Sequence, residues 1–382
     1  MRVCLVYDCL YPHTVGGAER WYRNVGERLA REGHAVTYLT LRQWARDETP
    51  DAPAGVAVAT AGPRMPLYRG PRRRIEPPLV FGAGVLWHLL RRGRRYDVVH
   101  LASFPYFSLL AAALARPLGG YRVVVDWHEV WTLGYWRGYL GRLPGRVGWL
   151  VQRLCALVPQ RAFCFSRLHA ERLRSLGFRG EVEVLHGQYV PRGERPSEES
   201  ADPPAVVFAG RHIPEKRAHA VVPAVAAARE RIPSLRAEIL GDGPEHGDVL
   251  EAVERAGLAG VVATPGFVSG ERVDAALQDA LCMLLPSMRE GYGLVVLEAA
   301  ARGTPSVVVS EPDNAATELV EDGVNGFVVP SASPGDLADA IVRAHEAGPA
   351  LRRSTAAWFG ANRERLSLEG SLGRVVEAYT RL

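Results

Sequence analysis

Residues 286–309 read PSMREGYGLVVLEAAARGTPSVVV, and this stretch decides the fold class. Residues 294–301 are apolar and alanine-rich, which favours a helix. Gly303 and Pro305 follow in the order that ends a helix. The β-branched run at 306–309 predicts a short buried strand. A loop, a helix and a strand in this order are typical of one repeat of an α/β sheet.

The loop before this helix has the composition of a ligand site. Gly291 and Gly293 let the backbone come close to a ligand, and the unpaired N–H groups at a helix start attract an anion. Glu290 precedes the helix and Glu298 lies within it, so two carboxylates flank a phosphate-sized pocket. A ligand with hydroxyl groups on both sides of a phosphate is a nucleotide sugar. The alternative is an ordinary helix with a solvated glutamate and a glycine turn.

Length and composition predict a soluble protein of two domains. The chain has 382 residues, of which 47% are hydrophobic and 23% charged, ordinary values for globular proteins. It opens with MRVCLVYDCL and passes straight into a predicted strand, so we expect no signal peptide. No apolar run reaches the ~20 residues of a membrane-spanning helix. The five cysteines have no metal-binding spacing, which indicates buried thiols of a cytoplasmic protein.

Charge is divided unevenly along the chain. Residues 1–200 carry 29 arginines and 17 acidic residues, whereas the remainder carries 17 basic and 25 acidic residues. The basic first half predicts an anionic partner on that side, and we do not expect nucleic acid. Lys216 is the single lysine among the 46 basic residues. Because arginine does not replace the compact ammonium group freely, Lys216 is a candidate functional residue.

The first 41 residues predict a βαβ unit, with strands at 1–7 and 35–41 around a helix at 20–31. Its turn, residues 16–19, reads GGAE and lacks the G-x-G-x-x-G pattern of a nicotinamide site. Residues 46–78 are rich in proline, glycine and alanine and predict a long irregular insert. This insert carries the arginines Arg64, Arg69, Arg72, Arg73 and Arg74. We prefer a solvated loop, with docking to an anionic membrane or acceptor as the alternative.

The middle of the chain supplies further candidates. His128 follows a predicted strand at 121–127, and open α/β sheets bind ligands at the carboxyl ends of their strands. His100 is a weaker candidate, and either histidine can instead be a satisfied structural residue. Residues 131–153, which include Trp131 and Tyr135, combine aromatic residues with arginines and no acid. This composition suits a membrane interface, an acceptor pocket or a half-buried helix.

A polar, proline-rich linker at 191–204 precedes a second α/β series. Its first strand, 205–209, is followed by Gly210 and Arg211 and then by Lys216. Further strands end in the glycine turn at Gly241 and in the sequence around Phe267 and Val268. Fixed cations after the first strand would stabilise the charge of a leaving diphosphate. No D-x-D pattern has a setting that suits a metal ion.

These motifs resemble those of the retaining family 4 glycosyltransferases. The resemblance is carried by PS, EGYG, LEA and GTP in order, by the E-x7-E spacing of Glu290 and Glu298, and by G-R-x4-K at residues 210–216. In the first half it is weaker and rests on GGAE, YDVVH and DWHE. Residues 186–191 keep only the glycine of the family's Asn-Gly-Val-Asp, so no catalytic role is carried over there.

The resemblance implies the GT-B fold, in which two Rossmann-like α/β domains with parallel sheets face each other across a cleft. We expect an acceptor domain at 1–195, a nucleotide-sugar domain at 196–366, and a C-terminal helix at 367–382 that crosses back to the first domain. The implied reaction moves a sugar from a nucleotide diphosphate sugar to an acceptor hydroxyl with retention. It needs no metal and no cofactor besides this co-substrate.

The resemblance also assigns roles to residues. Catalysis is expected from His128, Glu290, Lys216 and Arg211. Donor binding is expected from Gly16, Gly17, Gly210, Arg211, Lys216, Gly241, Phe267, Val268, Glu290, Gly291, Tyr292, Gly293, Leu294 and Glu298. Acceptor binding is expected from Glu19, Trp131 and Tyr135.

Three other interpretations stay open on the sequence alone. They are a nucleotide-sugar epimerase of the same fold, an NAD-dependent oxidoreductase, which the missing fingerprint disfavours, and an inactive protein that binds membranes. The acceptor is a lipid, a glycan or a specialised metabolite, and the basic first half favours an anionic or membrane-borne one. We expect a cytoplasmic protein, peripheral on the inner face of the cell membrane.

Overall fold

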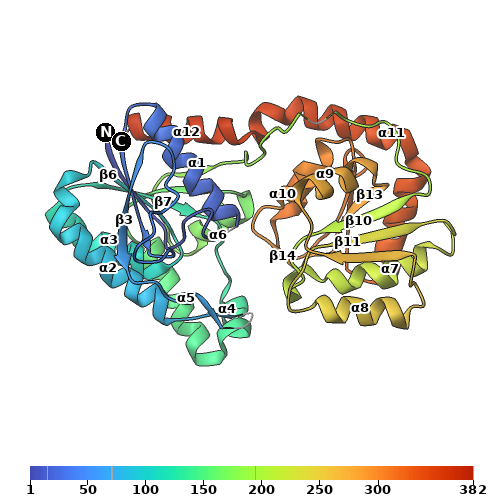
Figure 1. Cartoon of the computed structure of the whole chain (residues 1–382), viewed down its shortest axis with the longest axis horizontal. Helices are drawn as coiled ribbons and strands as arrows, with labels where there is room; N and C mark the ends of the chain where they lie inside the picture. Colours follow the sequence, from blue (N-terminus) through green and yellow to red (C-terminus); the bar gives the residue numbers. More distant parts are fainter. Residues whose placement is uncertain (15, 70–71, 194, 382) are drawn as a thin grey trace. The chain divides into compact units, whose positions relative to one another are not determined.

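A computed structural model describes residues 1–14, 16–69, 72–193 and 195–381 (Figure 1). Of Arg69 and Arg72 it describes only the backbone, so the charge contacts predicted for them lie outside the described part. The chain divides into two compact units, which we call the first unit (1–186 and 369–382) and the second unit (187–368). The sequence placed these boundaries after residues 195 and 366. The predicted α/β class, with one Rossmann-like parallel sheet in each unit, is confirmed.

The first unit contains a seven-stranded parallel sheet in the order β3-β2-β1-β6-β7-β8-β9. Its strands are β1 (Arg2–Val6), β2 (Ala35–Leu41), β3 (Val56–Gly62), β6 (Val98–Ala102), β7 (Arg122–Trp127), β8 (Arg161–Cys164) and β9 (Val182–Val184). Its helices are α1 (Gly17–Arg31), α2 (Glu76–Arg92), α3 (Tyr106–Gly119), α4 (Leu133–Leu140), α5 (Arg142–Ala156), α6 (Arg167–Ser175) and α12 (Leu368–Thr380). Helix α1 follows the predicted pattern, because Trp21, Val25 and Leu29 are buried on one face.

The prediction of an irregular insert at 46–78 is wrong. Strand β3 lies inside it and extends the sheet beyond β2, and α2 begins at Glu76. The short hairpin of β4 (Tyr68–Arg69) and β5 (Arg72–Arg73) accounts for part of the remainder. The helix start was marked by two prolines after Glu76, the position where a missing N–H group costs nothing.

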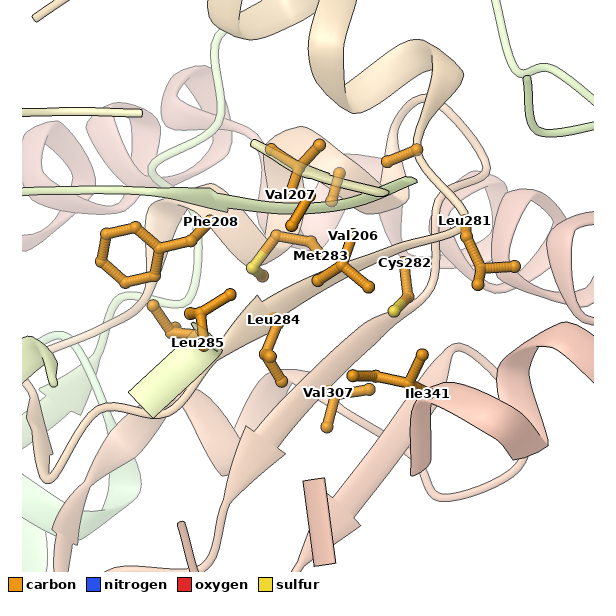
Figure 2. Close-up of a cluster of buried hydrophobic side chains, with 14 of the residues drawn as sticks. Val206, Val207, Phe208, Leu281, Cys282, Met283, Leu284, Leu285, Val307 and Ile341 are labelled. Atoms are coloured by element: carbon orange, nitrogen blue, oxygen red, sulfur yellow. The ribbon is translucent and has the colours of Figure 1, made fainter. Parts of the chain in front are cut away.

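The second unit contains a six-stranded parallel sheet in the order β12-β11-β10-β13-β15-β17. Its strands are β10 (Ala205–Ala209), β11 (Arg236–Leu240), β12 (Val262–Gly266), β13 (Cys282–Leu285), β15 (Ser306–Val309) and β17 (Gly326–Val329). Its helices are α7 (Val221–Ala228), α8 (His246–Arg255), α9 (Gly270–Asp279), α10 (Leu294–Ala300) and α11 (Pro334–Leu366). Figure 2 shows the apolar side chains that fill its core, from Val206 to Ile341.

The last helix belongs to the first unit. Helix α12 packs there through Tyr379, whose hydroxyl lies 2.6 Å from Nδ1 of the buried His100 on β6. Tyr189 lies near the start of the second unit. Its carbonyl oxygen accepts a hydrogen bond from Leu368 N (2.8 Å), at the start of α12, and its N–H donates one to Leu366 O (3.1 Å), at the end of α11. The two segments that begin and end the second unit are therefore hydrogen-bonded side by side.

Over the described residues, no helix combines the length and the apolar character needed to cross a bilayer. All five cysteines are buried as free thiols, as the sequence predicts. Burial raises the pKa of Cys4 and of Cys282 to about 12, so both stay protonated near neutral pH.

Candidate functional site

The predicted site residues Lys216 and Glu290 are in direct contact in the second unit. The Lys216 ammonium pairs with Oε1 of Glu290, and Ser287 Oγ donates a hydrogen bond of 2.8 Å to the same oxygen. Glu290 is only 7% exposed, so its carboxylate depends on these partners in place of water. The contact joins groups that are 74 residues apart in the chain.

The loop that carries Glu290 is held between two neighbouring strands. It follows β13, and its short strand β14 (Arg289–Glu290) pairs in parallel with β16 (Asp313–Asn314), which follows β15. The buried Asn314 amide donates to Ser287 O (3.2 Å) and to Val309 O (2.8 Å). Met288 N also donates to Glu215 O (2.8 Å). The Glu290 carboxylate is thus fixed at the carboxyl ends of β13 and β15, where open α/β sheets bind ligands.

Lys216 lies in a strained turn beyond β10. It ends the 3₁₀ turn Pro214–Lys216, and the next residue, Arg217, has a φ of +49°, which L residues rarely adopt. Arg217 is held by Glu311 Oε1 at 2.6 Å. Such strain persists where surrounding contacts over-determine it, and it clusters at ligand sites. Arg211 is exposed on the same connection and is available to a ligand.

Helix α10 carries the second carboxylate of the predicted pair. It is seven residues long, so its dipole is small, and Glu298 is half-buried within it. Arg192 Nη2 lies 4.0 Å from Glu298 Oε1. Gly293 caps the helix with a φ of +100°, and a Cβ atom there would lie 2.6 Å from Cβ of Ala316. Gly293 is therefore required by the fold, whatever it contributes to a ligand.

The other predicted donor residues have different surroundings. Gly210 and Gly241 belong to neighbouring connections, and a Cβ atom on Gly241 would lie 1.9 Å from Gly210 O, so close backbone approach explains the glycine at 241. Phe267 is 85% exposed, whereas Val268 packs against the core. Tyr292 also packs against the core, and burial raises the pKa of its hydroxyl. Gly291 and Leu294 flank the same turn, between β14 and α10.

In the first unit, His128 lies at the carboxyl end of β7 as predicted. Its ring stacks on Phe165, with centroids 4.4 Å apart and planes 8° apart, and Tyr22 of α1 lies edge-on at 6.4 Å. Its Nε2 is buried and has no hydrogen-bond partner among the described residues. Burial lowers the pKa of His128 despite the nearby carboxylates of Asp126 and Glu129. A neutral imidazole with an unsatisfied nitrogen can bind a hydroxyl group.

His100 is a structural residue. It is fully buried, with Nε2 2.9 Å from Asp126 Oδ1 and Nδ1 on the Tyr379 hydroxyl. Trp21 Nε1 donates to the other Asp126 oxygen at 2.7 Å. Burial alone would raise the pKa of Asp126, but His100 and the hydrogen bond from Trp21 lower it. The set ties α1 and α12 to the centre of the sheet.

The remaining candidates of the first unit, Gly16 and Gly17 for the donor and Glu19, Trp131 and Tyr135 for the acceptor, are near these elements. Gly16 precedes α1, Gly17 begins it, and Glu19 lies in its first turn; a Cβ atom on Gly16 would lie 2.3 Å from Glu19 Oε2. Trp131 and Tyr135 are half-buried, with ring centroids 4.7 Å apart. Trp131 Nε1 also donates to Glu129 Oε2 at 2.6 Å, so this part of the aromatic stretch is packed on its own domain.

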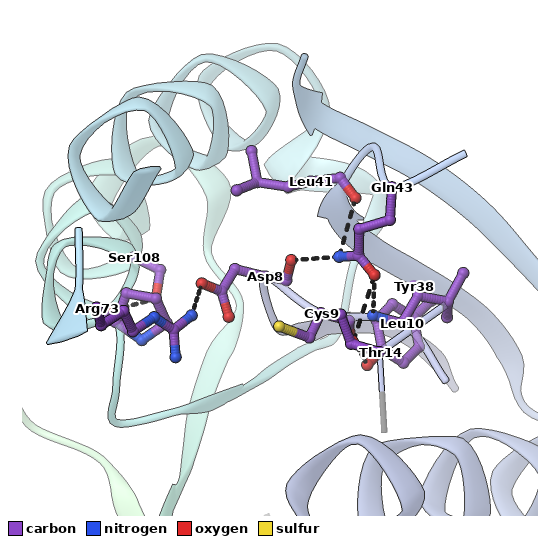
Figure 3. A network of polar contacts seen from close by, with 10 residues as sticks. Asp8, Cys9, Leu10, Thr14, Tyr38, Leu41, Gln43, Arg73 and Ser108 are labelled. Atoms are coloured by element: carbon purple, nitrogen blue, oxygen red, sulfur yellow. Dashed lines mark hydrogen bonds and ion pairs between the residues drawn. The ribbon is translucent and has the colours of Figure 1, made fainter. Parts of the chain in front are cut away.

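One arginine of the predicted solvated loop is half-buried and pairs with a buried carboxylate of the sheet. Arg73 pairs with Oδ2 of Asp8, a fully buried residue that follows β1. Figure 3 shows this pair beside Gln43, whose amide donates to Asp8 O at 2.7 Å and accepts from Leu10 N at 2.9 Å. The solvated-loop interpretation is therefore wrong for Arg73, because a buried carboxylate requires a paired cation.

Sequence reasoning missed two residues that hold the Glu290 loop, Ser287 and Asn314. Ser287 was visible as part of the quoted PS, but a hydroxyl gives no signal of its partner. Asn314 caps the 3₁₀ helix Ala315–Leu319 and accepts from Ala316 N at 3.1 Å, a helix-capping pattern that could have drawn attention to it. In the described part of the chain, no cluster of three or more His, Cys, Asp or Glu side chains could hold a metal ion.

Comparisons with known proteins agree with this geometry. The family described as "Glycosyltransferase Family 4" matches residues 15–187, and "Glycosyl transferases group 1" matches residues 192–357. The chain belongs to glycosyltransferase family 4. Among solved structures, this family 4 chain is similar over its whole length to sucrose-phosphate synthase from Thermosynechococcus elongatus (TM-score 0.78, 20% identity, 98% of that chain). It is likewise similar to Anabaena HepE, solved in complex with UDP (TM-score 0.73, 17% identity, 100% of both chains). These likenesses establish the GT-B fold.

Curated relatives of this family 4 chain are glycosyltransferases with different names. Alpha-D-kanosaminyltransferase of Streptomyces kanamyceticus is 30% identical over 180 residues, which cover 47% of this chain and 46% of that protein. D-inositol 3-phosphate glycosyltransferase of Streptomyces griseus is 32% identical over 183 residues (46% and 38%). The chain thus spans less than half the length of these two. One component of the phosphatidylinositol N-acetylglucosaminyltransferase of Arabidopsis thaliana is 26% identical over 358 residues (90% and 74%).

Proposed function

We propose that the protein is a retaining glycosyltransferase that moves a sugar from a nucleotide diphosphate sugar to an acceptor hydroxyl. The observation that carries this proposal is the contact of Lys216 with Glu290 at the carboxyl ends of the second sheet. This contact places a cation that can bind a diphosphate oxygen beside a carboxylate that can bind sugar hydroxyls. Family membership and the UDP bound to the HepE structure support a nucleotide-sugar donor.

In the proposed reaction, the bond between the anomeric carbon and the diphosphate oxygen breaks on one face of the sugar. The acceptor hydroxyl attacks from that same face, and its proton passes to the departing diphosphate. Lys216 and Arg211 stabilise the charge that develops on the diphosphate, as fixed cations do in a preorganised site, and so replace a metal ion. Glu290 holds the donor sugar and Glu298 the ribose, while His128 binds sugar and aligns the acceptor.

We further propose that the first unit binds an anionic or membrane-borne acceptor. That unit carries more basic than acidic residues, whereas the second unit carries more acidic than basic ones. Two of the three relatives have names that include a phosphorylated inositol, whereas the first is named for a kanosaminyl group. A specialised-metabolite acceptor is therefore the alternative that an acceptor screen must include.

Thermal unfolding with UDP, GDP, dTDP and ADP tests the donor site. A nucleotide at ~100 times its dissociation constant adds ~2.7 kcal/mol to the free energy of unfolding. We expect one nucleotide to stabilise the protein, Glu298→Ala to remove that shift, and Glu251→Ala, an exposed glutamate on α8, to keep it. If no nucleotide stabilises the protein, the proposal fails.

Product analysis tests the reaction itself. The anomeric configuration of the product, read by NMR, should equal that of the donor, and an inverted product would contradict retention. Incubation of the protein with the donor alone separates transfer from epimerisation, because an epimerase converts the donor sugar without an acceptor.

A further inference from the structure

Helix α5 of the first unit presents an apolar face to solvent. Five side chains along it and at its C-cap, spaced four, three, four and three residues apart, are each at least 47% exposed: Leu143, Val147, Leu150, Leu154 and Leu157. With 3.6 residues per turn, this spacing places all five on one face. The solvent face of a surface helix ordinarily carries polar residues, so this face has the opposite pattern.

The opposite face of α5 is fixed by tight packing. A Cβ atom on Gly148 would lie 2.6 Å from the ring of Trp136, and one on Gly145 would lie 2.4 Å from the Trp136 carbonyl oxygen. Gln152 is fully buried and accepts from Tyr106 at 2.9 Å. The helix therefore cannot rotate to bury its leucines without breaking this packing.

The apolar face continues over the neighbouring helices α3 and α2. On α3, Leu114 and Leu118 are 69% and 58% exposed. On α2, Leu79, Trp87 and Leu90 are between 45% and 58% exposed. The carboxyl ends of the three helices are linked, since Arg94 Nε donates to Leu118 O (3.1 Å) and Arg116 Nη1 to Pro159 O (2.9 Å). Figure 1 shows the three helices along the same face of the sheet.

Arginines surround this apolar face, and Glu76 at the start of α2 is the one acidic residue in the sequences of its three helices. Residues 98–125 and 130–170 contain no aspartate or glutamate. Over the described residues, the exposed Arg142, Arg146 and Arg153 make no ion pair. Arg91 lies over the ring of Trp87 at 3.6 Å, and Arg153 lies 5.6 Å from the ring centre of Trp149. Aromatic and arginine side chains together suit the boundary between lipid headgroups and acyl chains.

We propose that the exposed face of α2, α3 and α5 docks on an anionic lipid bilayer. The leucines enter the boundary of the acyl chains and the arginines contact the phosphates, so apolar burial and charge attraction add. Self-association of this face would set its unpaired arginines against those of a second copy, which is unfavourable. The inference rests on the proposed function in one respect, that the acceptor is reached at a membrane.

Co-sedimentation with vesicles tests the docking face. We expect the protein to bind phosphatidylcholine vesicles that contain phosphatidylglycerol and not those of phosphatidylcholine alone. Raising the salt from about 0.1 M to about 0.5 M should weaken binding by screening. Arg146→Gln with Arg153→Gln should lower the partition coefficient roughly thirtyfold, since each cation near an anionic surface contributes about a factor of five.

Leu150→Gln with Leu154→Gln should lower the partition coefficient by about tenfold or more, because the insertion of apolar area is lost. The controls are on α8 of the second unit: Leu250→Gln, a leucine that is 42% exposed, and Arg255→Gln. Both should bind like the unchanged protein. All variants should keep the nucleotide-induced shift of the melting temperature, which reports a folded second unit.

The outcomes separate the two proposals. Nucleotide stabilisation without vesicle binding overturns the docking face and leaves the donor site intact. Vesicle binding that needs Leu150 and Leu154, without stabilisation by any nucleotide, keeps the docking face and overturns the proposed function. A dimer in light scattering that Leu150→Gln with Leu154→Gln makes monomeric would assign the face to self-association and overturn the membrane proposal.

Discussion

The two units share a parallel α/β sheet but differ in where they place polar groups. The first unit buries Asp8, His100 and Asp126 completely at its sheet and leaves leucines of α5 on its surface. The second unit also buries polar side chains, such as the Arg352 guanidinium that donates to backbone carbonyls, but it gathers Ser287, Glu290 and Asn314 in the loops at the carboxyl ends of its strands. The difference teaches that the fold determines where a site can lie, at the carboxyl ends of the strands, but not how each unit is stabilised.

Removal of the Lys216 ammonium should have the largest effect, because the proposed donor site of the second unit depends on this cation. We expect Lys216→Ala to lower turnover about 10²–10³-fold, the range for the loss of one preorganised charge-stabilising group. Lys216→Arg should recover little, since a planar fork does not replace a point charge. The measurement is release of nucleoside diphosphate from the donor. Arg255→Ala serves as control, and full turnover of Lys216→Ala would remove the lysine from the site.

A Cβ atom at Gly293 should have the next largest effect, again in the second unit. Gly293→Ala places that atom 2.6 Å from Cβ of Ala316 at a φ of +100°. We expect the free energy of unfolding to fall by about 2 kcal/mol, together with loss of the nucleotide-induced shift. Gly247→Ala on α8, where a Cβ atom meets no neighbour, should instead be neutral or stabilising. Equal denaturation midpoints for the two variants would contradict this explanation.

Loss of one buried hydrogen bond tests the first unit. Tyr379→Phe leaves His100 Nδ1 without the hydroxyl that lies 2.6 Å away, at a cost of about 1–3 kcal/mol. Hydrogen exchange should show faster opening of α12 and β6, while the second unit is unchanged. Tyr139→Phe on α4, whose hydroxyl makes no hydrogen bond in the described structure, should leave exchange unaltered. Slower exchange or no change in Tyr379→Phe would show that the packing of α12 does not need this bond.

The smallest expected effect is a pH dependence shared by both units. Burial lowers the pKa of His128 in the first unit and, helped by His246, that of His212 in the second. As the pH falls, these two histidines are therefore protonated at a higher pH in the unfolded chain than in the folded one. The free energy of unfolding should fall as the pH drops below about 6.5. His212→Gln should reduce this fall in the second unit, and His128→Gln in the first, in urea titrations between pH 7 and 5. An acid sensitivity unchanged in both variants would assign it to other groups.

The sequence predicts the second unit better than the first for a physical reason. Strands β10 and β15 occupy the residues predicted for them, because strands covered on both faces appear as continuous apolar runs. Strand β3, at the edge of the sheet, alternates small residues among prolines and glycines, so its pattern does not differ from that of a loop. Arg73 lies in the same segment, so its contact with Asp8 could not be predicted either.

The candidate site was predictable in its residues but not in its contacts. Family motifs selected Lys216 and Glu290, yet the pairing of these two across 74 residues depends on strand order, which local patterns do not contain. The same limit applies to His100, a weaker candidate for ligand binding, which is instead held by Asp126 and Tyr379. Its partner Tyr379 comes from the other end of the chain.

The hydrogen bonds of Tyr189 with Leu366 and Leu368 bring the start and the end of the second unit together. Both chain termini belong to the first unit, so residues 187–368 are one continuous insertion whose ends lie together. Recombination at two points in the gene could therefore exchange the segment that encodes these residues between relatives. Such an exchange would replace the predicted donor residues around Glu290 while it preserves the docking face on α5. Donor and acceptor preferences could in this way evolve by recombination of separate modules.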